Sequence, residues 1–178
     1  MKKVNVFPGR FQPFHNGHLQ ACKDAMKENG LPTVVMYIHN DKFDEKKPFS
    51  DDLIERELNI IKNWEDCIED VIWLNRPWPT LVCRVLLEHG YEPVLWLAGE
   101  DRIDGYKKMV QADKIRNELK IEPPTFYLTN RYTSATIVRE AIKNDDIITF
   151  LNNMPDNADL LFDEFKEQLN KITNGSNS

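Results

Sequence analysis

The sequence predicts an α/β protein built on a Rossmann-like, doubly wound parallel sheet of about five strands with helices on both faces. Three observations support this fold class. Short apolar runs such as "TVVMYI" and "VLWLA" alternate with longer segments whose apolar residues recur at helical spacing. The alternation implies right-handed crossover connections, which produce a parallel sheet covered on both sides. Polar segments follow the first, fourth and fifth apolar runs, where such sheets bind their ligands.

Five apolar runs predict the strands, and the segments between them predict the helices. The strands are expected at residues 4–7, 33–40, 71–74, 94–98 and 125–128. The helices are expected at residues 17–29, 51–64, 81–89 and 106–119, with another beginning at Ser134. Asn16 has a side chain suited to the N-cap of the first helix, and Gly30 is suited to its C-terminal stop. Ser50 can cap the second helix in the same way.

The chain length and composition predict one principal domain at residues 1–155. Beyond it, apolar residues keep helical spacing from Leu160 to Leu169. Residues 156–172 are therefore expected to form a C-terminal helix that packs on the domain. The polar residues 173–178 predict a disordered tail.

The charge balance and the cysteines restrict the partners and the compartment. The chain has 23 Lys and Arg residues against 29 Asp and Glu residues, a net charge of −6. This excess of negative charge disfavours binding to nucleic acid or to an anionic membrane. The three cysteines form no CxxC pair and are expected to be buried free thiols, as suits a cytoplasmic protein. Composition leaves a homo-oligomer open.

The segment "GRFQPFHNGH", residues 9–18, joins the first predicted strand to the first predicted helix. A helix N-terminus presents backbone N–H groups and a partial positive charge, which attract phosphate. His15 lies just before this helix and His18 lies in its first turn. Gly17 lets a ligand approach the backbone closely, and Arg10 adds a permanent cation. Donors gathered in this way suit a triphosphate whose α-phosphorus gains negative charge in a transition state.

This segment resembles the (H/T)xGH signature of the nucleotidylyltransferase superfamily, which is related to class I aminoacyl-tRNA synthetases. Its form is most similar to nicotinamide mononucleotide (NMN) adenylyltransferases of the archaeal and Nudix-fused type. The tail of the matching region, up to about residue 155, resembles small nucleotidylyltransferases encoded by bacteriophages. The resemblance implies that His15 and His18 stabilise the transferring α-phosphate. It places the rest of the motif against the nucleotide: Gly9, Arg10, Phe11, Gln12 and Gly17.

The segment "TSATIVREAI" resembles the second signature of this superfamily, a hydroxyl-rich turn that opens a late helix and is followed by an arginine. Ser134 and Thr136 match the hydroxyl positions, and Arg139 matches the phosphate-binding arginine. The physical chemistry agrees with this assignment. Hydroxyl and N–H groups at a helix N-terminus can hold the β- and γ-phosphates, and a guanidinium can bind them with two hydrogen bonds.

Two further segments match the superfamily in part. "KKPFSDDLIERELNII" is similar to its "NPF(T/S)…ER…MI" segment, with Lys47 in place of the asparagine. The resemblance implies that Lys46 or Lys47 supplies a phosphate-binding lysine, as in some cytidylyltransferases, and a solvated charge run is the alternative. "GEDRIDG" is similar to the G-x-D loop of the superfamily. Asp101 and Arg102 are therefore candidates to contact the nucleotide or the acceptor, and capping of the next helix is the alternative.

Four tryptophans raise the question of how an acceptor base would be held. Trp78 lies between two prolines after the third predicted strand, and it is the candidate for stacking on the acceptor. Trp73, at the end of that strand, is expected to pack in the core. Trp64 and Trp96 are also expected in the core.

The resemblance implies transfer of a nucleoside monophosphate from a nucleoside triphosphate to a small phosphorylated acceptor, with release of pyrophosphate. The first expectation is that ATP and NMN give NAD. His15, His18 and Arg139 would be the catalytic residues, and Mg²⁺ would be held by the substrate and water rather than by metal ligands of the chain. One alternative is a cytidylyltransferase that acts on a sugar or alcohol phosphate. The other is a nucleotide-binding module without catalysis.

Other chemistries lack their sequence signatures. There is no GxGxxG fingerprint after the first predicted strand and no Walker A GxxxxGK[ST] segment, which argues against a dehydrogenase and a P-loop kinase. A zinc site built on His15 and His18 would need further ligands that the sequence does not place.

Overall fold

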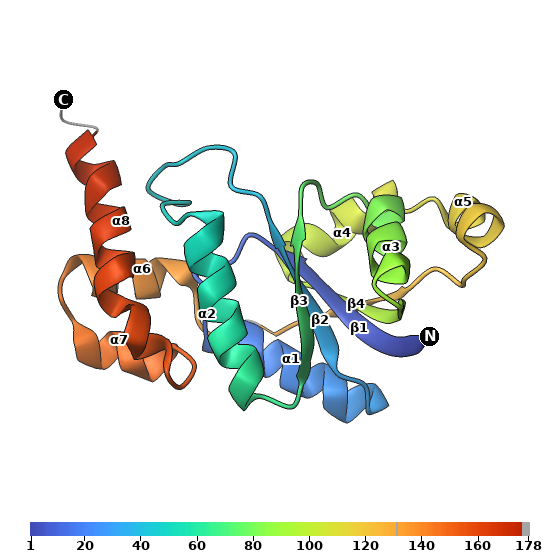
Figure 1. The fold of residues 1–178 in the computed structure, drawn as a ribbon, viewed down its shortest axis with the longest axis horizontal. Helices are drawn as coiled ribbons and strands as arrows, with labels where there is room; N and C mark the ends of the chain where they lie inside the picture. The colour runs from blue at the N-terminus through green and yellow to red at the C-terminus, as the bar shows by residue number, and fades with distance from the viewer. Residues whose placement is uncertain (131, 176–178) are drawn as a thin grey trace.

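The computed structural model describes residues 1–130 and 132–175, and in it five parallel strands form one sheet (Figure 1). The strands are β1 (Lys2–Gly9), β2 (Thr33–Ile38), β3 (Ile68–Leu74), β4 (Tyr91–Ala98) and β5 (Thr125–Leu128). Their order across the sheet is β3-β2-β1-β4-β5. The predicted Rossmann-like α/β fold is confirmed.

The central strand β1 lies at the point where the winding of the chain reverses. Val6 pairs with Val34 of β2 on one side and with Trp96 of β4 on the other. The chain first winds outward from β1 through β2 to β3, and then returns to the other side for β4 and β5. Open α/β sheets bind ligands beyond the carboxyl ends of the strands at such a reversal.

Helices cover both faces of the sheet (Figure 1). One face carries α1 (Asn16–Asn29) and α2 (Asp51–Trp64), and the other carries α3 (Pro79–Glu88) and α4 (Glu100–Met109). After α4 follow the short helix α5 (Ala112–Lys114) and the π-helix η1 (Ile115–Leu119). Neighbouring residues of a strand point to opposite faces, so Phe7 joins the core under α1 and α2 whereas Val6 joins the core under α3 and α4.

The C-terminal helices extend the core on the α2 side and gather at one end of the molecule (Figure 1). They are α6 (Ala135–Lys143), α7 (Ile147–Asn153), the 3₁₀-helix η2 (Ala158–Leu161) and α8 (Phe162–Gly175). Helix α8 extends past residue 172, where the sequence predicted its end, because the chain continues without a helix breaker to Gly175. The rest of the predicted disordered tail, residues 176–178, lies outside the described residues.

Several local predictions are confirmed. Gly30 ends α1 with φ 75°, a left-handed conformation that glycine adopts without steric cost, and Ser50 caps α2 by accepting from the Leu53 N–H. Trp96 is fully buried, and Cys22, Cys67 and Cys83 are buried free thiols. In the described part of the chain, no helix combines the length and the apolar character needed to cross a membrane.

Other local predictions are wrong, each for a physical reason. The segment 99–105 is not a loop, because α4 begins at Glu100, where two acidic residues favour the positive end of the helix dipole. Trp64 and Trp73 are not core residues: their side chains are 70% and 46% exposed. The N-cap of α1 is His15 rather than Asn16, and this difference bears directly on the site.

Candidate active site

A cavity of about 680 Å³ lies beyond the carboxyl ends of β1, β4 and β5. It brings together most of the residues that the sequence predicted for the site, from segments up to 130 positions apart. The predicted residues that line it are Gly9, Arg10, Phe11, His15, Gly17, His18, Asp101, Arg102, Ser134, Thr136 and Arg139. Gln12, Lys47 and Trp78 are predicted site residues that do not line it.

The two histidines of the motif cap their own helix. The His15 Nδ1 accepts from the Gly17 N–H at 3.0 Å, and the His18 Nδ1 accepts from the His15 N–H at 3.1 Å. These reciprocal bonds form a capping box in which imidazoles take the place of the usual hydroxyl and carboxylate. Because each Nδ1 is an acceptor, each neutral ring carries its proton on Nε2. The backbone thus fixes the tautomer of both histidines.

Aromatic rings surround the histidine pair. The His15 and His18 rings stack with centroids 3.8 Å apart and an interplanar angle of 19°. The centroids of Phe7, Phe11 and Phe14 lie 5.8, 4.9 and 5.2 Å from that of His18. Burial among these rings lowers the pKa of His18 well below its usual value, and the neighbouring His15 lowers it further. His18 is therefore a neutral hydrogen-bond donor at pH 7, which agrees with the accepting role of its Nδ1.

The backbone of the motif leaves no room for other side chains at two positions. A Cβ on Gly17 would lie 2.9 Å from the His15 Cε1, because the capping ring folds back over this residue. A Cβ on Gly9 would lie 2.7 Å from the ring of Phe11, which itself has a positive φ of 53°. Glycine at these positions is what allows the rings of Phe11 and His15 to close over the turn.

Helix α6 directs a second N-terminus at the same cavity. Ser134 is its N-cap and accepts from the Ile137 N–H at 3.3 Å. The Arg139 Nη1 donates to the carbonyl oxygen of Gln12 at 2.8 Å, and its Nη2 lies 3.5 Å from the Thr136 hydroxyl. Burial lowers the pKa of Arg139, but a guanidinium stays cationic in proteins. Arg139 of α6 thus links the N-terminus of α6 to the segment that precedes α1, and it places a positive charge between the two helix N-termini.

Gln12 has a structural rather than a cavity-facing side chain. Its Nε2 donates to the Phe49 carbonyl at 3.1 Å, and its Oε1 accepts from the Phe49 N–H at 2.8 Å. These bonds attach the loop between β2 and α2 to the motif. Lys47 lies in that loop, in a turn that is closed by backbone bonds with Asp44.

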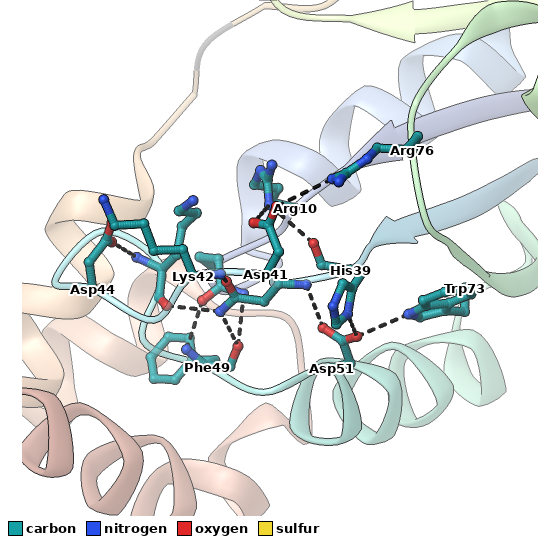
Figure 2. A network of polar contacts seen from close by, with 12 residues as sticks. Arg10, His39, Asp41, Lys42, Asp44, Phe49, Asp51, Trp73 and Arg76 are labelled. Atoms are coloured by element: carbon teal, nitrogen blue, oxygen red, sulfur yellow. Dashed lines mark hydrogen bonds and ion pairs between the residues drawn. The ribbon is translucent and has the colours of Figure 1, made fainter.

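A polar network joins the carboxyl ends of β1, β2 and β3 (Figure 2). Asp51 accepts from the Asn40 N–H at 2.8 Å and from the Trp73 indole at 3.0 Å, and its other partner is the His39 Nδ1 at 2.6 Å. Burial acts to raise the pKa of Asp51, but these donors together hold it below its usual value. Trp73 therefore serves as a hydrogen-bond donor at the sheet edge, which explains why it is not in the core.

Two arginines flank one carboxylate in this network (Figure 2). Asp41 lies 3.3 Å from the Arg76 Nη1 and 3.6 Å from the Arg10 Nη1, and Arg10 also donates to the His39 carbonyl at 3.1 Å. The hydrogen bond from Arg76 lowers the pKa of Asp41. Sequence reasoning missed Arg76, although a basic residue directly after a strand was a signal for it. Arg10 lines the cavity, and Arg76 lies beyond it across Asp41 on the β2–β3 side.

Trp78 lines a second cavity, of about 550 Å³, between the start of α3 and the end of α4. Its indole is 57% exposed, and the exposed Met109 lies on the opposite helix. Three cationic side chains also line this cavity: Arg84, Lys108 and Lys114. The cavity combines aromatic surface with positive charge, which suits an aromatic anion.

Comparison with known proteins places this geometry in a family. The family model described as cytidylyltransferase-like matches residues 6–141, which include both helix N-termini of the site. A nicotinate-nucleotide adenylyltransferase of Bacillus subtilis is 24% identical over 165 residues, covering 81% of this chain and 87% of that protein. A phosphopantetheine adenylyltransferase of Malacoplasma penetrans is 35% identical over 77 residues, covering 39% of this chain and 51% of that protein. The chain thus spans about half the length of the second relative.

Solved structures share the fold. A bifunctional NMN adenylyltransferase/ADP-ribose pyrophosphatase of Francisella tularensis, solved with AMP and a manganese ion, superposes with a TM-score of 0.66 at 16% identity. That match covers 99% of this chain and 53% of the other. A Plasmodium falciparum nicotinic acid mononucleotide adenylyltransferase, solved with NaAD, gives 0.58 at 16% identity, with 97% of each chain covered. These likenesses show the fold, and because the family model matches residues 6–141, well over half of the chain, the chain belongs to the cytidylyltransferase-like family.

Proposed function

We propose that this protein is an adenylyltransferase, which transfers AMP from ATP to a small phosphorylated acceptor and releases pyrophosphate. One observation carries the proposal. His15 and His18, with their tautomers fixed by the backbone, line the same cavity as Arg139 and the N-terminus of α6. Hydrogen-bond donors at two helix N-termini around one cavity suit a triphosphate and the charge that develops on it during transfer.

The reaction follows from these positions. A phosphate oxygen of the acceptor attacks the α-phosphorus of ATP, the bond from that phosphorus to the bridging oxygen breaks, and pyrophosphate leaves. The Nε2–H groups of His15 and His18 stabilise the charge on the α-phosphate. Arg139 and the α6 N-terminus, with the Ser134 and Thr136 hydroxyls, hold the β- and γ-phosphates. The acceptor is already a nucleophile, so the residues act by positioning and by electrostatic stabilisation.

The nucleotide substrate is MgATP, with Mg²⁺ held mainly by triphosphate oxygens and water, as is usual for this ion. Glu100 and Asp101 line the cavity in the first turn of α4, where their carboxylates could accept hydrogen bonds from water bound to the ion. The ion would neutralise the developing charge on the pyrophosphate. Arg102, next to this pair, is proposed to contact the nucleotide or the acceptor, as is Asp101.

The acceptor is proposed to enter from the β2–β3 side, where Arg10 lines the cavity and is suited to its phosphate, with Arg76 beside it across Asp41. Trp78 lines the second cavity, and its stacking on the acceptor base is proposed from the sequence. A mononucleotide such as NMN or nicotinate mononucleotide combines both groups, and the names of the relatives support this class. Lys46 and Lys47, in the loop that Gln12 attaches to the motif, are proposed to reach the phosphates when substrate binds.

Pyrophosphate release tests the proposal most simply. The assay pairs ATP or CTP, each with Mg²⁺, with NMN, nicotinate mononucleotide, phosphopantetheine, a sugar or alcohol phosphate, or no acceptor, and His18→Ala is the control. Release that needs ATP together with one acceptor, and that His18→Ala lacks, is the expected result. Release with CTP and a sugar or alcohol phosphate instead would overturn the proposed adenylyltransferase and show a cytidylyltransferase. ATP binding without release for any acceptor would favour a nucleotide-binding module.

A further inference from the structure

Glu57 is a carboxylic acid in the core directly behind the site. It lies on α2, and its side chain is fully buried at 0% exposure. Its Oε1 accepts from the Phe14 N–H at 3.1 Å, and within residues 1–130 and 132–175 its Oε2 has no hydrogen-bond partner. Burial raises the pKa of this carboxyl well above its usual value, against a smaller opposite effect of the Phe14 N–H. Burial therefore favours the protonated, neutral form of Glu57.

Stability alone does not account for a carboxyl at this position. Its neighbours on the buried face of α2 are Leu53, Ile54, Leu58 and Ile61. A polar atom left without a partner in such a core lowers stability, whereas an apolar side chain of similar volume carries no such cost. Among the residues that the structure describes, the one group that bonds to Glu57 through its side chain is the Phe14 N–H. This donor lies just before α1, so the helix supplies no acceptor for it.

The Phe14 peptide leads directly to the catalytic histidines. Phe14 precedes His15, and its ring lies 5.2 Å from His18 and 5.2 Å from Phe11, between centroids. A shift of the Phe14 backbone would move the His15 N–H, which is the donor that fixes His18. The bond from Phe14 to Glu57 thus connects α2 to the histidine pair through two hydrogen bonds and one ring contact.

We propose that Glu57 is a positioning residue that fixes the Phe14 peptide from inside the core and thereby orients His15 and His18 for transfer. The effect on transfer rests on the proposed function, whereas the orientation of the two imidazoles by Glu57 does not. It assigns to α2 a part in the site that the sequence motifs do not contain. A neutral carboxyl suits this task because its carbonyl oxygen accepts the bond without bringing a negative charge toward the phosphates.

The test compares two replacements of Glu57. Glu57→Gln keeps a carbonyl acceptor for Phe14, and Glu57→Leu removes it while filling the core; Glu57→Met is the second apolar variant in case leucine does not fit. Ile61→Val, on the same buried face, is the control for general repacking. The readouts are the imidazole Cε1–H signals of His15 and His18 in ¹H–¹³C spectra, the melting temperature, and kcat against KM.

We expect Glu57→Leu to melt close to the wild-type temperature, because removing the unpaired Oε2 offsets the loss of an acceptor for the Phe14 N–H. It should shift the imidazole signals and lower kcat by up to about 10²-fold with KM for ATP little changed. Glu57→Gln should keep wild-type signals and turnover. Wild-type imidazole signals in both apolar variants would overturn the proposal, and so would equal losses in Glu57→Gln and Glu57→Leu. The spectra need no substrate, so they decide the positioning role even if no acceptor supports turnover.

Discussion

The two strand–helix junctions of the site differ in how they hold their polar groups. At the β1–α1 junction, His15 is buried and His18 is packed among three phenylalanine rings, with each Nδ1 bonded to the backbone. At the β5–α6 junction, Thr136 is exposed and Ser134 is half-buried. The histidines of the first junction are held by hydrogen bonds within the protein before substrate arrives, whereas the second junction leaves its groups accessible to solvent.

The difference indicates a division of labour in this cavity. Charge stabilisation in a transition state gains most from donors that need no reorganisation, which fits the first junction. Binding of a flexible triphosphate tail needs accessible hydroxyl and N–H groups, which fits the second. Arg139 connects them, because its guanidinium donates to Gln12 of the first junction while it belongs to the helix of the second.

Loss of a rigid donor should have the largest effect. His18→Ala is expected to lower kcat by about 10²–10³-fold, the range for removing one preorganised donor, while the protein remains folded. Pyrophosphate release measures the rate, and thermal unfolding checks the fold. A folded variant with wild-type turnover would remove His18 from the reaction.

A change at the connection between the junctions should come next. Arg139→Lys keeps the charge but loses the planar fork that reaches Gln12 and Thr136 together, so we expect a loss of about 10- to 10²-fold in kcat/KM. Lys143→Arg, on the same helix, is the matched control and should behave as the wild type. Turnover of Arg139→Lys equal to that control would show that the two junctions are not coupled through this residue.

The buried support of the first junction predicts a dependence of stability on pH. Since burial raises the pKa of Glu57 in the folded state above its usual value of 4.5, its contribution to stability is complete below pH 4.5 and is lost as the pH rises toward the folded pKa. Glu57→Gln does not titrate. The free energy of unfolding of Glu57→Gln should therefore rise relative to that of the wild type. The rise should be about 1.4 kcal/mol for each pH unit between 4.5 and the folded pKa of Glu57. Urea unfolding measures this, and a gap that stays constant with pH would contradict it.

The smallest effect is expected at the second junction. Ser134→Ala removes the cap of α6 and should cost about 1 kcal/mol of stability with a rise of several-fold in KM for ATP. Ser50→Ala removes the equivalent cap of α2, outside the cavity, and should affect stability without changing KM. If both variants raise KM equally, the change reflects stability alone.

Contiguous features of the site could be predicted from the sequence. The residues 9–18 and the turn at Ser134 are local motifs, and strand–helix alternation brings them to one sheet edge. The imidazole cap of His15 was missed because asparagine is the commoner cap residue. Residue preferences also give no information on how the His15 ring lies over Gly17. The start of α4 was missed because its glycine and acidic residues resemble a loop.

The groups that depend on distant segments could not be predicted in this way. Asp41 and Arg76 follow different strands, and only the register of β2 against β3 brings them together with Arg10. Glu57 reads as an ordinary helical residue until the packing of α2 places it behind Phe14. Trp73 resembles a core residue in the sequence because its indole bond to Asp51 is a tertiary contact.

The division of labour between the two junctions has one direct test, a comparison of His18→Ala with Thr136→Val in the same steady-state assay with ATP and the acceptor that supports turnover. We expect His18→Ala to lower kcat with little change in KM for ATP. We expect Thr136→Val to raise KM by about 5-fold, the effect of one hydrogen bond, with little change in kcat. The same change in kcat and KM for both variants, or the reverse assignment, would contradict it.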